Sequence, residues 1–450
     1  MDVPASMRFF ANALSEYSTN SIQLQSLNQT TLSTRSGATQ LQVALPVSAM
    51  VNLKSLQLHA DFQTYGLAES AAGAADSVQA LIPRGGIAAA VDSVHVSLGG
   101  ISADNAPNNY ALQHLVKQGQ ECTLNKYMSD VKVLENGCIE PYGTIDAATN
   151  GQRKSLVMTN FLGFMEAEPE FMPMDLLPEV RLQVRLATDN SCIPVQFEGA
   201  QLGAAAVNAN PNWTKNNCRL ELQNIYFTCD VCSVGDGLYQ AMAEKMLEKE
   251  GSLDIPFKSY NLNQVAADSS AVSVRGSVSS LSLDCLRAFA RNEETVASGA
   301  AYEPWSSQQP PVECSGSTTF SHQQANCNFI SQGLSSWQFR ANSSPSPLFT
   351  PDAITAYSQQ VAAYQRGYSK VRGSLSGSQE MFLNNQWCAI AKYCHDLDSV
   401  REVSGLDLRS IQAAVEFNAT GTGYKRQYFL MSEQTSMCRV GAGRAVSILQ

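Results

Sequence analysis

The chain has 450 residues, enough for two large β domains, and 44% of them are hydrophobic, which is ample for sizeable cores. Only 16% are charged, so the surface consists largely of uncharged polar groups and suits broad contact with other protein subunits. The net charge of −10 argues against a chain that coats DNA, because phosphate neutralisation needs clustered Lys and Arg, and we expect no sequence-specific nucleic-acid binding.

The N-terminal residues carry no export signal. Met1–Ala13 has no basic region followed by an apolar core, and no run of 18 apolar residues occurs in the chain. We therefore expect a soluble, non-secreted protein. Residues 7–17 place apolar side chains at helical spacing and predict a short amphipathic helix. Two interpretations stay open: a segment docked on its own domain, or an arm that anchors the subunit to a neighbour or to a membrane surface.

The first half of the chain shows the period-two alternation of half-buried strands. Strands are predicted over residues 22–25, 41–45, 56–62, 91–98, 180–186 and 219–231. In the last of these, we expect Leu220, Leu222 and Tyr226 on one face. Gly66–Ala80 is poor in large apolar residues and is predicted to be a surface loop, whereas residues 109–118 predict a short helix.

The stretch Glu166–Ala187 begins with acidic residues and prolines and ends in the strict alternation of Val180–Leu186. The apolar face of that strand requires a partner sheet. Glu166, Glu168 and Glu170, together with Asp175, suggest a calcium or paired-carboxylate site, but calcium loops carry a denser ligand pattern that includes glycine. We therefore interpret the acidic lead-in as a solvated loop.

The second half repeats the order of the first. Residues 238–249 predict a helix that ends at Gly251 and connects two β regions. Corresponding strands are Leu281–Cys285 with residues 56–62, Trp337 and Phe339 with Val96 and Leu98, and Ile411–Phe417 with Val180–Leu186. A helix over residues 351–365 again follows the second of these strands. The sequence therefore predicts that the chain consists of two copies of one β unit.

Many short strands, one embedded helix and large loops favour a β-sandwich for each unit, and a jelly roll closes its edges by wrapping two four-stranded sheets. An up-and-down barrel is the alternative, but its short hairpin loops fit less well. We predict an all-β fold of two tandem eight-stranded jelly-roll β-sandwiches with short inserted helices. The expected parts are an N-terminal arm (1–20), a first jelly roll (21–235), a helical connector (236–251) and a second jelly roll (252–450).

Sequence motifs for chemistry are sparse. Cys229 and Cys232 form the one C-x-x-C motif. Zinc would need two further ligands, for which Cys388, Cys394 and His395 are the candidates, although nothing in the sequence indicates that they come together. A redox motif should open a helix, whereas these cysteines end a strand, so we expect free thiols. The chain has five histidines and lacks the signatures of hydrolases, zinc proteases and phosphate-binding loops. We predict no enzyme, no cofactor and no metal. The competing hypothesis is a zinc enzyme built on Cys229, Cys232, Cys394 and His395, which elemental analysis would test.

Three segments carry a family resemblance: Ile82–Gly100 with its Ile-Pro-Arg-Gly-Gly start, Asn108–Leu112, and Pro173–Leu186 with its Pro-Met-Asp-Leu-Leu-Pro start. Together they resemble major capsid proteins of tailless double-stranded DNA viruses. The nearest similarity is to the polinton-like virus and virophage group, within the double jelly-roll lineage that includes adenovirus hexons. The resemblance covers most of the first half by motif and the second half by topology.

The resemblance implies a virion protein with two jelly rolls side by side, and a homotrimer whose six similar β-barrels fit hexagonal positions of an icosahedral shell. Its partners would be neighbouring capsomers together with penton and minor capsid proteins, and an internal membrane stays undecided. The N-terminal arm, with Phe9, Phe10, Leu14 and Tyr17, would face the capsid interior or contact a neighbour. The alternative function is a receptor- or glycan-binding β-sandwich protein of a virion, with exposed aromatic residues clustered at one loop end.

Overall fold

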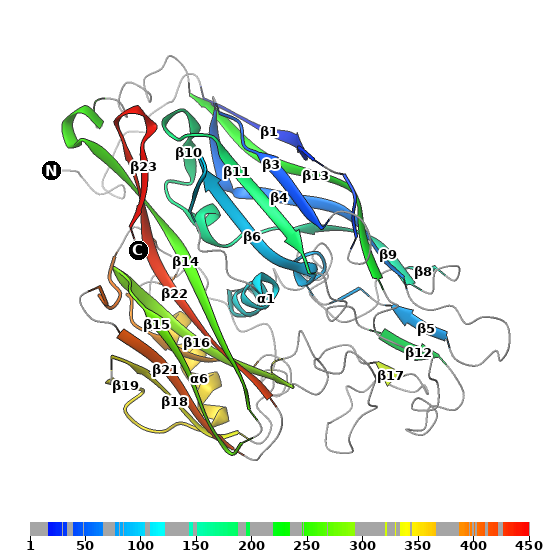
Figure 1. The fold of residues 1–450 in the computed structure, drawn as a ribbon, viewed down its shortest axis with the longest axis vertical. Helices are drawn as coiled ribbons and strands as arrows, with labels where there is room; N and C mark the ends of the chain where they lie inside the picture. The colour runs from blue at the N-terminus through cyan, green and yellow to red at the C-terminus, as the bar shows by residue number, and fades with distance from the viewer. Residues whose placement is uncertain are drawn as a thin grey trace, which may run out of the picture.

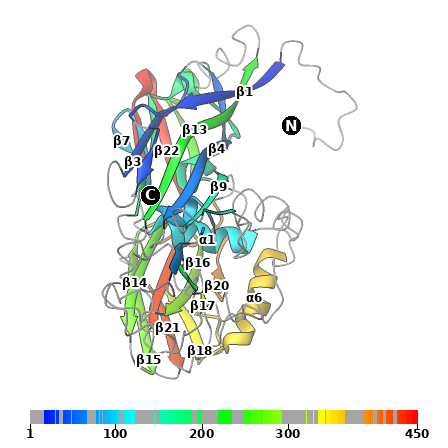
Figure 2. The same cartoon turned by 90° about the vertical axis from the view of Figure 1, so that its right-hand side faces the viewer.

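In a computed structural model the chain forms four sheets of mainly antiparallel strands, which pair into two sandwiches (Figure 1). The structure describes residues 17–28, 30–33, 39–47, 49–65, 77–80, 82–83, 85–103, 109–121, 144–146, 151–187, 195–198, 219–234, 245, 247–267, 269–292, 320–321, 329, 334–342, 344–365, 387–395, 397, 400, 403–409, 413–421 and 426–449. In Figure 2 the sandwiches lie one above the other, with α1 (Tyr110–Glu121) at the level where they meet.

Eight strands form the two facing sheets of the first sandwich. They are β1 (Tyr17–Gln25), β3 (Gln40–Ala44), β4 (Met50–Tyr65), β6 (Val91–Leu98), β7 (Ile101–Ser102), β9 (Gly151–Met158), β11 (Val180–Leu186) and β13 (Arg219–Val234). One sheet contains the order β1-β13-β4-β9, and the other has the order β3-β11-β6-β7. The chain thus passes back and forth between the sheets, as in a jelly roll.

Short elements extend this sandwich. The strands are β2 (Leu32–Ser33), β5 (Ser77–Ala80), β8 (Thr144–Asp146), β10 (Phe171–Pro173), β12 (Val195–Glu198) and β17 (Phe320–Ser321), and the 3-10 turns are η2 (Ala88–Ala90), η4 (Gly163–Glu166) and η5 (Met174–Leu176). The loop prediction for Gly66–Ala80 is wrong at its end, because β5 pairs with β12 there; residues 66–76 lie outside the described residues. β12 also pairs with β17, so excursions of both halves of the chain share one sheet.

The second sandwich is built in the same way. Its strands are β14 (Ser252–Ala267), β15 (Ala271–Val278), β16 (Ser282–Asn292), β18 (Leu334–Ala341), β19 (Ser344–Ser346), β20 (Ala389–Lys392), β21 (Ala413–Gly421) and β22 (Arg426–Gly441). The sheets have the orders β14-β22-β16-β20 and β15-β21-β18-β19. After the turn η9 (Ala442–Arg444), β23 (Val446–Leu449) pairs back on β22.

The two sandwiches share one topology. Numbered along its own eight strands, each has the sheet orders 1-8-3-6 and 2-7-4-5. A helix follows the fifth strand in both, α1 in the first and α6 (Ala353–Gln365) in the second. This confirms the predicted fold of two eight-stranded jelly rolls with inserted helices. It also confirms the predicted correspondences of β4 with β16, β6 with β18 and β11 with β21.

Strand burial follows the sequence alternation, except where a bulge intervenes. In β11 the four apolar positions are buried and Arg181 and Arg185 are exposed, as predicted. In β13, Leu220 and Leu222 are buried, but the register with β4 shifts after residue 223, where Asn224 has a φ of 52°. The buried positions then change parity, so Tyr226 does not share the face of Leu220, and that prediction is wrong.

The predicted helix before the second sandwich is described only at its end. Lys245 and residues 247–250 are helical, and the rest of 238–249 lies outside the described residues. Gly251 has a φ of 75° and donates its N–H to the Leu247 carbonyl oxygen at 2.8 Å, which ends the helix as predicted. Among the described residues, no helix is long and apolar enough to span a membrane.

One strand pair belongs to both sandwiches. β14 and β22 have 16 residues each and pair without interruption from Ser252 opposite Gly441 to Ala267 opposite Arg426. In Figure 1 the pair runs diagonally from the first sandwich into the second. Phe257, in the N-terminal half of β14, is part of the core of the first sandwich, whereas Val265, near the C-terminal end of the strand, packs against the core of the second. The two cores are therefore joined through a continuous ladder.

Candidate functional site: a buried ionic network between the two sandwiches

The predicted arm lies almost entirely outside the described residues. This applies to Phe9, Phe10 and Leu14. Tyr17 opens β1 and its backbone is paired with Val234 of β13. The role of the arm therefore stays a prediction.

The cysteines of the C-x-x-C motif are buried in the first sandwich as free thiols. Burial, reinforced by the neighbouring Asp230, raises the pKa of the Cys229 thiol to about 11. Cys394 is a buried free thiol beside Cys285 of β16, while the backbone N–H of His395 donates to Ser404 Oγ at 2.9 Å. Within the described part of the chain, no three His, Cys, Asp or Glu side chains come close enough to hold a metal ion.

The acidic stretch before β11 is a contact region. Lys54 Nζ lies 3.5 Å from Glu168 Oε1, and Asn52 Nδ2 donates to Glu170 Oε1 at 2.9 Å. Glu166, at the end of η4, is ion-paired with Lys117 of α1. The interpretation as a solvated loop is therefore wrong for Glu166, because the second sandwich closes over this turn.

Lys117, Glu166 and Tyr260 form the contact between the sandwiches. Lys117 Nζ donates to Glu166 and to the hydroxyl of Tyr260, which comes from β14. That hydroxyl donates in turn to Glu166 Oε2 at 2.6 Å, and the Gly163 N–H donates to the same oxygen at 3.0 Å. Lys117 Nζ also lies 4.8 Å from the centre of the Tyr260 ring. Two residues of the first sandwich thus hold one of the second.

Glu433 of β22 is the buried centre of the network. Its side chain has no exposed surface and is ion-paired with Arg287 of β16, which is equally buried. Glu433 Oε1 faces the ammonium groups of Lys117 and Lys258, each at 3.8 Å. Burial alone would raise the pKa of Glu433, but the charges of Arg287, Lys117 and Lys258 outweigh it and lower the pKa to about 2. This carboxylate is therefore charged at neutral pH.

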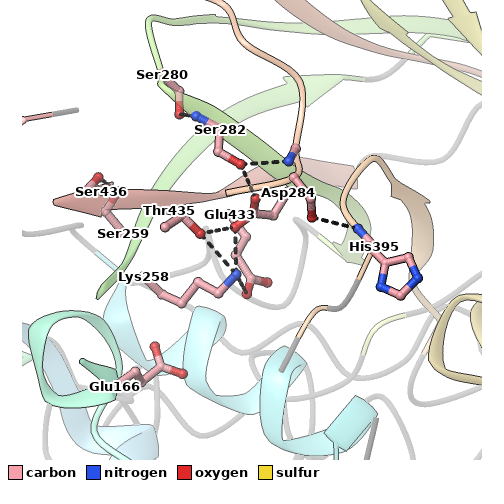
Figure 3. A network of polar contacts seen from close by, with 12 residues as sticks. Glu166, Lys258, Ser259, Ser280, Ser282, Asp284, His395, Glu433, Thr435 and Ser436 are labelled. Carbon is pink, nitrogen blue, oxygen red and sulfur yellow. Dashed lines mark hydrogen bonds and ion pairs between the residues drawn. The ribbon is translucent and has the colours of Figure 1, made fainter. Parts of the chain in front are cut away.

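A second buried ion pair continues the network (Figure 3). Lys258 Nζ of β14 lies 2.6 Å from Asp284 Oδ2 of β16, and Thr435 Oγ1 donates to the same oxygen at 2.6 Å. Ser282 Oγ donates to Asp284 Oδ1 at 2.6 Å and accepts the Gly405 N–H at 2.9 Å. Burial alone would lower the pKa of Lys258, but Glu433 and Asp284 offset this and raise it.

The network combines three cations and three carboxylates: Lys117, Lys258, Arg287, Glu166, Asp284 and Glu433. Opposite charges balance. Hydrogen bonds from Ser282, Thr435, Tyr260 and the Gly163 N–H satisfy Asp284 and Glu166, whereas Glu433 is held by its ion pairs with Arg287, Lys117 and Lys258. Apolar contact surrounds it, with the rings of Phe164 and Phe257 5.4 Å apart at an angle of 65°. Such an arrangement fixes one orientation of the two sandwiches and offers no activated nucleophile.

Sequence reasoning identified Glu166 and missed the other five residues. Glu433 lies in the polar run Ser432–Ser436, which is buried throughout only because β14 and β16 flank it. The one available signal was a pair of charges, Asp284 and Arg287, inside an apolar strand that the alternation assigned to the core.

Two complete jelly rolls in one chain, joined by a shared ladder and a buried junction, define a double jelly-roll protein. The chain is similar to PBCV-1 VP54, whose crystal structure was fitted into a reconstruction of the virophage Sputnik (TM-score 0.61, 9% identity, 98% of this chain and 99% of that chain). It is also similar to the faustovirus major capsid protein (TM-score 0.59, 10% identity, 98% and 92%) and to a chain of the Sputnik virophage structure (TM-score 0.56, 8% identity, 98% and 90%).

No protein-family model and no curated protein sequence matches the chain. At these identities the likeness establishes the fold, and it does so over nearly the whole length of both chains. The chain therefore has the fold of the faustovirus major capsid protein.

Proposed function

We propose that this protein is the major structural subunit of an icosahedral virus capsid and acts in the virion without enzymatic activity. The observation that carries the proposal is the pair of complete jelly rolls, matched over 98% of the chain to VP54 and over 99% of VP54 itself. A fold match confined to one sandwich would fit many binding proteins. A match that includes both sandwiches and their relative placement favours the shell-building role.

We propose a homotrimer as the building block. Three copies of a chain with two equivalent sandwiches present six similar units around one axis, which suits a hexagonal position in a shell. The rigid junction at Glu433 supports this, because the two sandwiches of each copy must keep one relative orientation for the ring to close. The proposed parts are those of the sequence analysis, and β14 begins at Ser252, at the expected start of the second jelly roll.

Light scattering during size-exclusion chromatography tests the trimer, and electron microscopy of concentrated samples tests the shell. We expect a species of three times the 48.6 kDa subunit mass, and hexagonal arrays or closed particles. A protein that stays monomeric at micromolar concentration and forms no arrays would contradict the proposal. Saturable glycan binding by such a monomer would favour the alternative of a binding protein of the virion.

The N-terminal arm is proposed to contact the capsid interior or a neighbouring subunit through Phe9, Phe10, Leu14 and Tyr17. Replacing Phe9 and Phe10 together by Ser should leave trimers intact and reduce the yield of closed particles. The matched control is Asn12→Ser, which changes a polar residue of the same segment. Equal particle yields for both variants would remove the arm from the assembly mechanism.

A further inference from the structure

A buried lysine and a buried aspartate face each other in the second sandwich. Lys258 lies on β14 and Asp284 on β16, and β22 runs between these two strands. Lys258 Nζ lies 2.6 Å from Asp284 Oδ2, and the two side chains are only 3% and 2% exposed. An amine and a carboxyl group that are held together away from water have the starting arrangement for an amide bond, because their encounter no longer limits the reaction.

Asp284 lies in a β-bulge. The pairing of β16 with β22 passes from Leu283 directly to Cys285, so Asp284 is the extra residue of the bulge. Bulges re-aim side chains and are frequent beside reactive sites. The backbone carbonyl oxygen of Asp284 accepts the N–H groups of Tyr393 at 2.8 Å and of Cys394 at 3.2 Å. The residues that follow β20 therefore hold the bulge in place.

The two carboxylate oxygens of Asp284 have different partners (Figure 3). The Ser282 hydroxyl donates to Oδ1 at 2.6 Å, and the Thr435 hydroxyl donates at 2.6 Å to Oδ2, which also faces the lysine. A Cβ added at Gly405 would lie 2.7 Å from Oδ1, so the Gly405 backbone packs against this oxygen. Hydrogen-bond donors in such a buried site stabilise the negative charge that develops on oxygen when an amine adds to the carboxyl carbon.

Glu433 supplies a proton acceptor beside the lysine. Its side chain is fully buried, and Oε1 lies 3.8 Å from Lys258 Nζ. Among the described residues Oε1 accepts no hydrogen bond, so its lone pairs are available. Lys258 is ion-paired and therefore charged in the resting network, and it is not a nucleophile in that form. The amine becomes nucleophilic when a neighbouring base takes a proton from it, which is the role that Glu433 Oε1 can fill.

We propose that Lys258 and Asp284 form an amide bond within the chain after the subunit has folded, and that Glu433 carries the proton. Glu433 takes one proton from the ammonium group, and the free amine attacks the Asp284 carboxyl carbon. The bond between Nζ and that carbon forms, and the bond from the carbon to Oδ2 breaks. The proton on Glu433 and a second proton from Nζ go to Oδ2, which leaves as water. The ammonium and the carboxylate thus become one neutral amide and one water molecule, with nothing oxidised or reduced.

The bond would add a covalent tie to the junction between the sandwiches. It joins β14 to β16 across β22 and closes a loop between residues 26 positions apart. Phe257 of the first core precedes Lys258 on β14, so the tie fixes the strand pair that the two cores share. A cross-link of this kind restricts the unfolded chain and thereby stabilises the folded one. Each subunit makes the bond by itself, whether or not it assembles into a shell, which is a property beyond the proposed shell-building role.

Mass spectrometry of the intact chain and of its peptides tests the bond. We expect the measured mass to fall short of the sequence mass by one water molecule, in a fraction of chains that rises during a week of incubation after purification. Proteolysis should yield a branched peptide in which Lys258 is joined to Asp284. Lys54 and Glu168 are the internal control: Nζ and Oε1 lie 3.5 Å apart, but Lys54 is 41% exposed, and their peptides should stay separate.

Two variants test the roles of the side chains, and circular dichroism should show the parent fold for both. Lys258→Arg keeps the positive charge but has no amine, so it should retain the full mass. Glu433→Gln keeps the shape of the proton carrier without its basicity and should slow formation of the branched peptide at least about 100-fold. Equal rates for the parent and Glu433→Gln would overturn the role of Glu433.

The parent chain decides whether the bond exists. A parent chain that keeps its full mass after the week, with Lys258 recovered in a linear peptide, would overturn the bond and leave the proposed function standing. Linked chains that stay monomeric and form no arrays would support the bond and remove the proposed function instead.

Discussion

Lys117 Nζ of α1 and Glu433 Oε1 of β22 lie 3.8 Å apart, so a cation of the first sandwich faces a carboxylate of the second across the junction between them. Arg287 and Lys258 approach the same carboxylate from neighbouring strands. The relative placement of the two sandwiches is therefore coupled to the charge of one fully buried group.

Glu433→Gln should destabilise the protein by about 3 kcal/mol, because it leaves three buried cations with less compensating charge. The control is Glu416→Gln on β21, which removes the partner of Arg275, whose side chain is 70% exposed. That change should cost no more than about 1 kcal/mol. Urea denaturation of the parent protein and the two variants gives both changes in the free energy of unfolding. Equal changes for Glu433→Gln and Glu416→Gln would show that the buried network stabilises the protein no more than an exposed ion pair does.

Acid should remove this stabilisation below pH 4.5. The pKa of Glu433 is lowered from 4.5 to about 2 in the folded protein, so its contribution is complete above pH 4.5 and disappears as the pH falls toward 2. The stability difference between the parent protein and Glu433→Gln should therefore shrink across this range. Asp407→Asn is the comparison, because the pKa of Asp407 is also lowered to about 2 but the group is exposed to solvent. Its thermal melting curves should stay close to those of the parent.

Gly151→Ala should destabilise the first sandwich by about 3 kcal/mol, since an added Cβ would lie 1.8 Å from the Thr64 carbonyl oxygen of the neighbouring strand. Gly441→Ala is the control: Gly441 also lies in a strand, and its Cβ would meet nothing nearer than 3.8 Å. The control should stay within about 0.5 kcal/mol of the parent. Melting temperatures measured by calorimetry decide between the two outcomes.

Buried thiols should be inert in the folded protein. Burial raises the pKa of Cys229 to about 11 and that of Cys438 to about 12, so few of these groups are thiolates at pH 8. Alkylation followed by peptide mass spectrometry should label both residues only after denaturation. Labelling of Cys229 in the native protein, at a rate similar to that of a free peptide, would contradict its buried position.

The alternating strands could be predicted because burial on one face leaves a period of two in the sequence. Val180–Leu186 and Val415 with Phe417 show this clearly, and their correspondence predicted the duplication. The bulge at Asn224 could not be predicted, since nothing in the alternation marks a residue that leaves the ladder.

The ionic network could not be predicted from the sequence for a different reason. No strand was predicted over residues 252–278 or 426–441. β22 is buried on both faces and therefore lacks the alternation, whereas β15 alternates strictly and could have been predicted. A polar run such as Ser432–Ser436 resembles a loop until its partners are known. Glu433 and Lys117 meet only when both jelly rolls have formed, so their pairing depends on the tertiary fold.

The ladder of β14 and β22 also governs how the chain loses its structure. Phe257 and Val440 belong to the first core although they lie in the second half of the chain, so the first half has no complete interior of its own. A fragment that begins at β14 would lack the first sandwich, so the buried side chains of Phe257 and Tyr260 would be exposed to water. We expect such a fragment to aggregate through this apolar surface. Thermal unfolding of the two sandwiches should accordingly be a single cooperative event, and the subunit acts as one thermodynamic unit.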